Sequence, residues 1–460
     1  MPPTSLPDMP LTADPIADWH QGLDESLALE SAAWLTERQL ERGLAFGDRP
    51  LCTVLRPRFL RSAEYDALRA VSDDLLGAFQ VAGEAAQADA KFRRQFRMTD
   101  WEVTLLETSP RMSALAPLSR LDAFIDPADG IPLITEYNAE TPAGTAYCDA
   151  LSDLFLAMPA MRAFATRWSV RPLPARHHLF NVLLDTWHRF RGVRTAPAIA
   201  IVDWHDVPTV SEFRLSRDYF QSMGCECVIT TPDALSYESG KLRDTSGMVV
   251  DLIYKRVLIH ELIEECGLDH ALVRAAVDGA VCLVNPFSCK PLHKKASLAV
   301  LSDERNSPVF SRGQTNAIAR HIPWTRVVEE RRTIVAGEQI DLVPWIAGHR
   351  DQLVLKPNDD YGGGGIVLGW EVDGAAWELA VTRALAEPYI VQRRIALPSE
   401  PFATVADGKL ALDQRIVDTA PFCWHGAWSD GMLCRISTSS LVNVTAGGGS
   451  TLPTFVVEPR

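Results

Sequence analysis

The stretch LVLKPNDDYGGGGIVLG, residues Leu353–Gly369, decides how the rest of the chain is interpreted. Its apolar ends, Leu353–Leu355 and Ile366–Leu368, predict two buried strands joined as a hairpin. The tip of this hairpin is a run of four glycines: Gly362, Gly363, Gly364 and Gly365. Glycine adopts positive φ without strain, so successive N–H groups can converge on an anion. Lys356, at the end of the first strand, adds a positive charge suited to a phosphate.

A phosphate-binding hairpin is therefore the interpretation that we prefer, and a flexible surface turn is the alternative that a glycine run leaves open. The stretch is not a Walker A loop, because Lys356 precedes the glycines and no Gly-Lys-Ser/Thr follows. It is not a dinucleotide-binding fingerprint either, since the glycines lead into a strand rather than a helix.

Bulk composition is that of a folded protein without nucleic-acid or membrane partners. The 460 residues are 47% hydrophobic and 23% charged, and this length predicts two or three domains. A formal net charge of −14 argues against non-specific nucleic-acid binding, although a local basic pocket can still hold a nucleotide. The chain contains no run of about 18 apolar residues, so we expect no membrane span.

Nine scattered cysteines form no CxxC pair, which indicates reduced and mostly buried thiols. The first residues have neither a basic segment nor an apolar core, so we expect no signal peptide. Together these features predict a cytoplasmic protein.

Composition and predicted secondary structure divide the chain into four parts. Residues 1–22, rich in proline and small polar residues, predict a disordered tail. The part 23–170 contains predicted helices over Glu64–Ala90 and Tyr147–Trp168 and a hairpin between them. Strands alternate with helices over 171–290, which predicts a parallel, doubly wound layer. The last part, 291–460, contains the glycine hairpin.

The hairpin of the second part spans Arg120–Asn138 and is the other candidate site. Residues two apart on a strand project from the same face, so Glu136 lies beside Asn138, and Arg120 beside Asp122 on the partner strand. Three hard oxygen donors on adjacent strands, from Asp122, Glu136 and Asn138, suit Mg²⁺. Arg120 can neutralise a phosphate or carboxylate there. Ordinary surface polar residues are the alternative.

These motifs together resemble a known family. The segment EYNAETP (Glu136–Pro142), the Lys295 segment and the glycine hairpin after Lys356 are similar to the circularly permuted ATP-grasp ligases, and within them to the glutathionylspermidine-synthase-like group. Ordinary ATP-grasp chains place the nucleotide-binding lysines first and the magnesium strand last. Here Glu136 precedes Lys356 by 220 residues, and an α/β layer lies between them. The resemblance covers roughly residues 90–455.

The resemblance implies a fold, a ligand set and a role for each matching residue. The fold would be a circularly permuted ATP-grasp domain in two parts, 23–170 and 291–460, around a pre-ATP-grasp-like layer. Asp122, Glu136 and Asn138 would hold Mg²⁺, and Lys295, Lys356 and the glycines would hold the ATP phosphates. Arg435 would lie near the transferred phosphate. The adenine edge would be lined by Val391 and Gln392, with the backbone making the hinge contacts.

This chain departs from the family at one place and leaves weaker candidates beside the main ones. Many relatives have a basic residue inside the glycine loop, where this chain has Gly364. Neither Arg393 nor Arg394 is assumed to replace it. Lys294 competes with Lys295, and we expect one of the two to be merely solvated. Arg256, after a strand of the α/β layer, could hold the acyl substrate or form a structural ion pair.

The resemblance implies an ATP-dependent carboxylate–amine ligase that forms an amide or peptide bond through an acyl phosphate. Its partners would be a small-molecule or peptide carboxylate and an amine. Two alternatives stay open: a nucleotide-binding scaffold or regulator without ligase turnover, which the glycine at position 364 favours, and a phosphotransferase that stops at the phosphorylated product. The sequence names neither the acid nor the amine, and it leaves the oligomeric state open.

Overall fold

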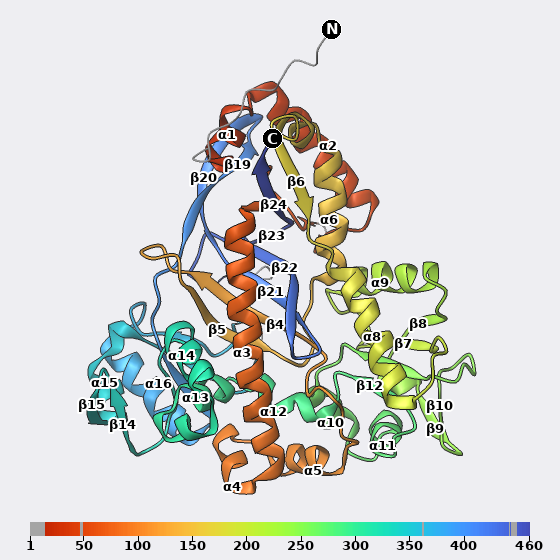
Figure 1. Ribbon diagram of the computed structural model, residues 1–460, viewed down its shortest axis with the longest axis vertical. Helices are drawn as coiled ribbons and strands as arrows, with labels where there is room; N and C mark the ends of the chain where they lie inside the picture. The colour runs from red at the N-terminus through yellow and green to blue at the C-terminus, as the bar shows by residue number, and fades with distance from the viewer. Residues whose placement is uncertain (1–13, 47–48, 361–362, 441, 443–448) are drawn as a thin grey trace.

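Figure 1 shows the computed structural model of the chain, which describes residues 14–46, 49–360, 363–440, 442 and 449–460. The fold is a mixed α/β arrangement of several sheets, and the long helix α3 (Ser62–Ala88) crosses its centre. The apolar spacing over Glu64–Ala90 predicted this helix, and the structure confirms it.

The largest sheet joins two distant parts of the chain. Its strands lie in the order β19-β20-β22-β21-β4-β5, and β23 pairs with β22. Their bounds are β4 (Leu118–Ile125), β5 (Pro132–Asn138), β19 (Ser399–Ala406), β20 (Lys409–Val417), β21 (Ala420–Trp424), β22 (Trp428–Ser437) and β23 (Ser450–Leu452). Arg120 lies opposite Asn138, and Asp122 opposite Glu136. The predicted hairpin over 120–138 is therefore confirmed.

A parallel sheet of four strands forms the layer predicted for the middle of the chain. Its order is β12-β11-β7-β8, and every pair is parallel. The strands are β7 (Ile199–Val202), β8 (Cys227–Thr230), β11 (Leu252–Lys255) and β12 (Cys282–Val284). The helices between and around them are α8 (Ala175–Arg191), α9 (Val210–Ser222), α10 (Ile259–Cys266) and α11 (Ala271–Val277). All residues of β7 are buried, as expected of a strand covered on both faces.

The glycine hairpin belongs to a third, smaller sheet of order β13-β18-β16-β17. Its strands are β13 (Thr325–Val327), β16 (Leu353–Pro357), β17 (Val367–Leu368) and β18 (Tyr389–Arg393). Val354 pairs with Leu368 and Leu355 with Val367, so the two predicted strands form the predicted hairpin. One face of the sheet packs against α15 (Leu342–Gly348) and α16 (Gly374–Ala386). The other packs through Ile390 against α13 (Ala296–Ser302).

A three-stranded sheet near the C-terminus lies at one end of the molecule (Figure 1). The last strand, β24 (Thr454–Pro459), lies between β3 (Arg58–Leu60) and β6 (Trp168–Pro172). Helices near this sheet share an apolar core with it; they are α1 (Pro15–Gln21), α2 (Glu25–Glu41), α6 (Thr145–Ala157) and α7 (Pro159–Phe164).

The remaining elements are short. They are β1 (Ala45–Phe46), β2 (Arg49–Pro50), α4 (Ala90–Arg93), η1 (Arg94–Phe96), α5 (Asp100–Thr108), η2 (Pro232–Ala234), β9 (Ser236–Glu238), β10 (Lys241–Arg243), η3 (Phe287–Cys289), α12 (Lys290–His293), η4 (Glu304–Val309), α14 (Arg312–His321), β14 (Arg332–Val335), β15 (Glu338–Asp341) and η5 (Arg350–Gln352).

The disordered tail predicted over residues 1–22 is wrong in its last part, since Pro15–Gln21 is helical and Trp19 is buried in the core. Residues 1–13 lie outside the described residues. Asp14 caps this helix and Pro15 occupies its first turn, a start signal that the overall composition of the segment hid. The single helix predicted over Tyr147–Trp168 is also wrong. It is broken at Pro159, which begins a second helix because proline lacks the N–H that an interior position needs.

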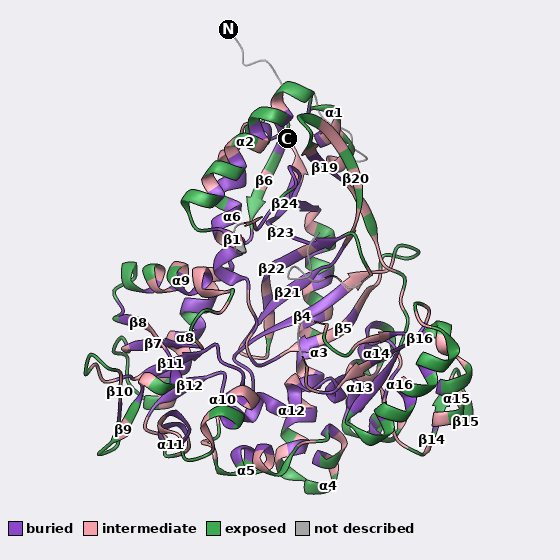
Figure 2. Ribbon diagram, turned by 180° about the vertical axis from the view of Figure 1, so that it is seen from behind, coloured by how far each residue is buried: buried purple, intermediate pink, exposed green. Residues whose placement is uncertain are grey.

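Burial follows this arrangement. Figure 2 shows buried strands at the centre of the molecule and exposed outer faces on peripheral helices such as α2 and α16. All nine cysteines are free thiols and eight of them are buried, which confirms that prediction. Within the part of the chain that the structure describes, no helix combines the length and apolar character needed to cross a bilayer.

Candidate active site between two sheets

A cavity opens between the large sheet and the small sheet, and both predicted motifs face it. The large sheet contributes strands β4, β5 and β22, and the small sheet contributes the glycine hairpin and β18. The described residues that line it are Asp122, Phe124, Thr135, Glu136, Val354, Lys356, Gly363, Ile366, Leu368, Trp370, Gln392, Arg393, Arg394, Ile395, Leu397, Arg435, Ser440 and Val442. Residues more than 200 positions apart thus share one site.

Asp122, on β4, is held between two arginines. Arg120 donates from Nε and Nη2 to its two carboxylate oxygens, at 2.6 and 3.0 Å. Arg435, on β22, donates from Nη2 to Asp122 Oδ2 at 2.8 Å. Burial by itself raises the pKa of Asp122, but the two guanidinium charges outweigh burial and hold this pKa well below its ordinary value. Asp122 is therefore a buried carboxylate that stays ionised.

Glu136, on β5, meets a lysine from another element. Its Oε1 lies 2.9 Å from Lys295 Nζ, at the start of α13. Burial raises the pKa of Glu136 and the charge of Lys295 lowers it. Asp122 raises this pKa and Lys356 lowers it, and the net shift is downward. The ionised form of this carboxylate is thus also favoured.

Lys356 reaches across from the small sheet to the large one. Its Nζ donates to the backbone oxygen of Thr135 at 3.1 Å and to Gln392 Oε1 at 2.8 Å. Burial lowers the pKa of Lys356, and although Glu136 raises it, Lys295 lowers it again, so that the pKa falls to about 8. The protein therefore holds this cation without fully compensating its loss of water.

The side chain of Arg435 is oriented by Asp418, a residue that the sequence did not identify as part of the site. Asp418, buried in the turn between β20 and β21, accepts from Arg435 Nε at 2.6 Å and from the Arg435 backbone N–H. Burial lowers the pKa of Arg435, but Asp418 and Asp122 raise it further, so the net shift is upward. A single aspartate between two strands has no periodic signal in the sequence. Its place beside Arg435 follows only from the pairing of β21 with β4 and β22.

The glycine loop is described from Gly363 onward, and Gly362 lies outside the described residues. Gly363 and Gly365 have φ of 82° and 64°, a conformation that other residues rarely adopt. Gly364 does not require glycine in this way, because a Cβ there would meet the flexible carboxylate of Asp360 at 3.0 Å. Of these glycines, Gly363 lines the cavity.

The predicted pair on β18 is divided between two faces of its strand. Gln392 lines the cavity and binds Lys356, whereas Val391 is fully buried in the core beneath α15 and α16. The side chain of Val391 therefore does not line the cavity. Alternation of side chains along a strand is the reason, and the backbone contacts predicted for this pair stay a prediction. Arg393 and Arg394 take places on the cavity wall beyond Gln392, and Arg394 stacks on Trp370.

Lys294 is buried rather than solvated, which corrects the expectation for this pair of lysines. It lies 2.8 Å from Glu102 and 3.0 Å from Asp359, whereas Lys295 faces Glu136. Lys294 belongs to a buried ion cluster that sequence analysis did not find; its members are Glu102, Glu140, Lys255, Lys290, His293, Lys294 and Asp359. This cluster ties the base of the glycine hairpin to α12, α5 and the parallel sheet.

Arg256 turns away from the solvent as well. Its Nη1 donates to the backbone oxygen of Pro142 at 2.7 Å, and its guanidinium lies near the rings of Phe213 and Tyr254. The observed contacts are structural, between the α/β layer and the loop after β5.

The donor set fits the chemistry of a magnesium ion. Asp122 and Glu136 are ionised, and the carboxamide of Asn138 has a buried nitrogen without a hydrogen-bond partner. Because a carboxamide can rotate to exchange its nitrogen and oxygen, Asn138 can present an oxygen at the same place. Among the described residues, no group of three or more His, Cys, Asp or Glu side chains is arranged to hold a metal. The predicted set differs from such a group in having two carboxylates and one amide.

Comparison with known proteins gives a likeness of fold. No protein-family model and no curated protein sequence match the chain. The structure is similar to a glutathione synthetase-like effector from Globodera pallida, with a TM-score of 0.63, 14% identity, and coverage of 94% of this chain and 98% of that one. A D-alanyl-alanine synthetase A from Vibrio cholerae matches with a TM-score of 0.25 and 12% identity, over 49% of this chain and 68% of that one. The first likeness shows a shared fold along nearly the whole chain.

Proposed function

We propose that the chain is an ATP-dependent carboxylate–amine ligase built on a circularly permuted ATP-grasp fold. One observation carries the proposal: Lys295 and Lys356 converge on the Glu136 strand from elements far away in sequence. Lys356 lines the cavity beside the ionised carboxylates of Asp122 and Glu136, and Lys295 reaches Glu136 from α13. This set of charges matches a triphosphate with a divalent ion.

The order of the two motifs supports the permuted form. The acidic hairpin β4–β5 comes first and the glycine hairpin last, with the parallel sheet between them. The fold shared with a glutathione synthetase-like protein is consistent with this order. We therefore assign ATP as substrate and Mg²⁺ as the ion that accompanies it.

Each residue of the site has a task in this reaction. Lys295 and Lys356 would bind phosphate oxygens, and Arg435 would neutralise charge on the phosphoryl group in transfer. Arg120 holds Asp122 ionised, while Asp122, Glu136 and Asn138 would hold Mg²⁺. A bound Mg²⁺ supplies Lewis-acid stabilisation of charge on the phosphate oxygens. The acid substrate would attack the γ-phosphate to give an acyl phosphate and ADP, and an amine would then displace phosphate.

Shielding from water is the task of the glycine hairpin. Gly363 lines the cavity, and without side chains the hairpin can approach the phosphates closely. An acyl phosphate hydrolyses in water, so covering it protects the intermediate until the amine arrives.

A nucleotide-binding scaffold without turnover is the second candidate, and one observation favours it. Both carboxylate oxygens of Asp122 already accept hydrogen bonds from Arg120. A site satisfied in this way can bind nucleotide without completing the metal centre.

An ADP-release assay separates the two functions. The purified chain is incubated with ATP, Mg²⁺ and mixtures of carboxylic acids with amino acids or polyamines. A ligase gives ADP that depends on both acid and amine, and hydroxylamine traps the acyl phosphate. A scaffold gives thermal stabilisation by ATP without ADP. Absence of both responses would contradict the proposal.

A further inference from the structure

Lys295 occupies the position that begins helix α13. It is the N-cap residue of Ala296–Ser302, and its own side chain makes no capping hydrogen bond. Instead Nζ reaches Glu136 at 2.9 Å and the backbone oxygen of Asp360. Because the side chain departs from the first residue of a helix, the place where that helix begins determines where the ammonium lies. Whatever fixes the start of α13 therefore positions Lys295.

Asn358, directly after β16, fixes that start. Its Oδ1 accepts from the Ala296 N–H at 2.8 Å, and its backbone oxygen accepts from the Lys295 N–H at 2.9 Å. The first N–H groups of a helix have no partner within the helix, and here a residue from another strand satisfies two of them. Asn358 thus caps α13 from outside.

The other polar atoms of Asn358 anchor it in turn. Nδ2 donates to the Phe96 backbone oxygen at 3.0 Å, and its backbone N–H donates to Pro388 O at 2.9 Å. The side chain is buried, at 3% exposure, and is not among the cavity-lining residues. Asn358 therefore acts at the site through Lys295 and not by direct contact with a ligand.

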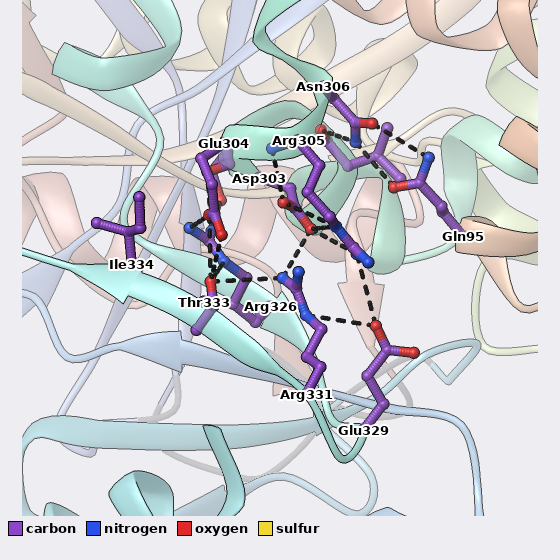
Figure 3. Close-up of polar contacts among 12 residues, drawn as sticks. Gln95, Asp303, Glu304, Arg305, Asn306, Arg326, Glu329, Arg331, Thr333 and Ile334 are labelled. Atoms are coloured by element: carbon purple, nitrogen blue, oxygen red, sulfur yellow. Dashed lines mark hydrogen bonds and ion pairs between the residues drawn. The ribbon is translucent and has the colours of Figure 1, made fainter. Parts of the chain in front are cut away.

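The far end of α13 is fixed to the same small sheet. Ser302, its last residue, donates from Oγ to Thr325 O at 2.8 Å, and Arg326 Nη1 donates to Ser302 O at 2.8 Å. Arg326 is held in turn by Glu304 at 2.6 Å. Figure 3 shows the contact of Arg326 with Glu304 and the neighbouring contacts of Asp303 with Arg305 and Arg331. With its C-terminus held this firmly, α13 is left to shift mainly at the end that Asn358 caps.

We infer that Asn358 is the positioning residue for Lys295. It couples the strand that carries the phosphate-binding Lys356 to the helix whose N-cap residue is the second lysine. Both cations are thereby held at a fixed separation in front of Glu136. The role rests on the proposed nucleotide site, and it goes beyond that site in naming the residue that sets the spacing of its lysines.

A double-mutant cycle tests this inference with Mg-ATP binding measured by calorimetry. Asn358→Ala should weaken binding by about tenfold, since losing a cap lets the helix start shift. Lys295→Ala should weaken it at least as much. In the double variant the losses should not add, because both substitutions remove the same contact. Additive losses would overturn the inference.

Gln39→Ala is the matched control. Gln39 is another buried carboxamide bound to backbone groups, but it lies in α2. It accepts from the Cys52 N–H at 2.8 Å and donates to Cys52 O at 2.9 Å and to Leu35 O at 3.3 Å. It should lose similar stability without loss of affinity for Mg-ATP. An equal loss of affinity in Gln39→Ala would show that destabilisation alone explains the Asn358 result.

A second readout does not depend on nucleotide binding. With Glu carboxyl groups labelled by ¹³C, the pKa of Glu136 is measured in the ligand-free protein and assigned with Glu136→Gln. Asn358→Ala should raise the pKa of Glu136 because Lys295 moves away from it, and Gln39→Ala should not. If the protein binds no nucleotide but this shift occurs, the ligase proposal fails and the positioning role stands. An unchanged pKa contradicts the positioning role.

Discussion

The acidic hairpin β4–β5 and the glycine hairpin β16–β17 face one cavity, but their surroundings have opposite effects on their charged groups: the carboxylates are stabilised and the ammonium is destabilised. The carboxylates of Asp122 and Glu136 have pKa values below their ordinary range, because arginines and Lys295 stabilise the anions. The Lys356 ammonium has its pKa lowered to about 8, because burial removes water that few partners replace. The carboxylates of the acidic hairpin are paired with cations, whereas the Lys356 ammonium lacks enough negative charge around it. An anionic ligand such as a triphosphate would supply the missing negative charge.

The largest expected effect comes from removing one charge on either side. Glu136→Ala and Lys356→Ala should each reduce ATP turnover by about a hundredfold or more, as when other charge-stabilising groups are removed from active sites. ADP release measures the loss, and circular dichroism checks that the fold remains. Lys409→Ala, at the exposed turn between β19 and β20, is the control and should keep wild-type turnover. Near-normal turnover in folded Glu136→Ala would remove the role assigned to this carboxylate.

The two hairpins should respond oppositely in stability. Asp122→Asn leaves buried Arg120 without its anion and Arg435 with Asp418 alone, so the free energy of unfolding should fall by about 3 kcal/mol. Lys356→Met removes a cation whose burial is unfavourable, so stability should be kept or should rise. Urea denaturation measures both. Asp66→Asn, at an exposed ion pair, should change little. A large loss of stability in Lys356→Met would contradict the comparison.

The pH dependence of Mg-ATP binding should show that the Lys356 ammonium lacks a compensating negative charge. A phosphate beside Lys356 raises its pKa above the ligand-free value of about 8, so binding takes up a proton at higher pH. Below pH 8 the lysine is charged in both states and affinity stays level. Above pH 8 affinity should fall by up to about tenfold per pH unit. Calorimetry with Mg-ATP measures this slope, which should be absent in Lys356→Met; a level affinity up to about pH 9 in the wild type would refute the assignment.

The lowered pKa of Lys356 also determines the direction in which the stability of the ligand-free protein changes with pH. The pKa of Lys356 in the folded state, about 8, lies below the ordinary lysine value of 10.5, so the unfolded state binds more protons between these values. Stability from this group should therefore rise as the pH increases through that window. Denaturation of wild type and Lys356→Met at several pH values measures the difference. An equal pH dependence of stability in both proteins would contradict the lowered pKa of Lys356.

The smallest effect should come from the glycine loop itself. Gly364→Arg would place a cation beside Asp360, whose flexible carboxylate can move or pair with it. Affinity for Mg-ATP should stay the same or tighten by about threefold, a gain typical of an exposed ion pair. Gly365→Arg is the contrasting variant, because its positive φ and the Pro357 ring at 2.6 Å forbid a side chain. Complete loss of binding in Gly364→Arg would show that this loop packs elsewhere.

The sequence predicted those parts of the fold that local patterns encode. The hairpin carrying Asp122 and Glu136 follows from alternation and a turn, and the glycine hairpin follows from two apolar runs around the glycines. Alternating strands and helices predicted the parallel sheet for the same reason. The signal of each hairpin, and of each single strand or helix in the alternating part, lies within about 20 residues of sequence.

What the sequence did not predict depends on contacts between distant segments. Asp418 aims Arg435 only because β21 and β22 join the sheet beside β4, and nothing near Asp418 marks that pairing. The ion pair of Glu140 with Lys290 joins residues 150 positions apart. Long-range pairing therefore limits prediction here more than local propensity does.

A crystal structure with Mg²⁺ and a non-hydrolysable ATP analogue would show whether one nucleotide binds between the two sheets. We expect the triphosphate in this cavity, with Lys295 and Lys356 contacting its oxygens and Glu136 turned toward the metal. A nucleotide bound outside this cavity, or one whose phosphates leave Lys356 on Gln392 and Thr135, would contradict it.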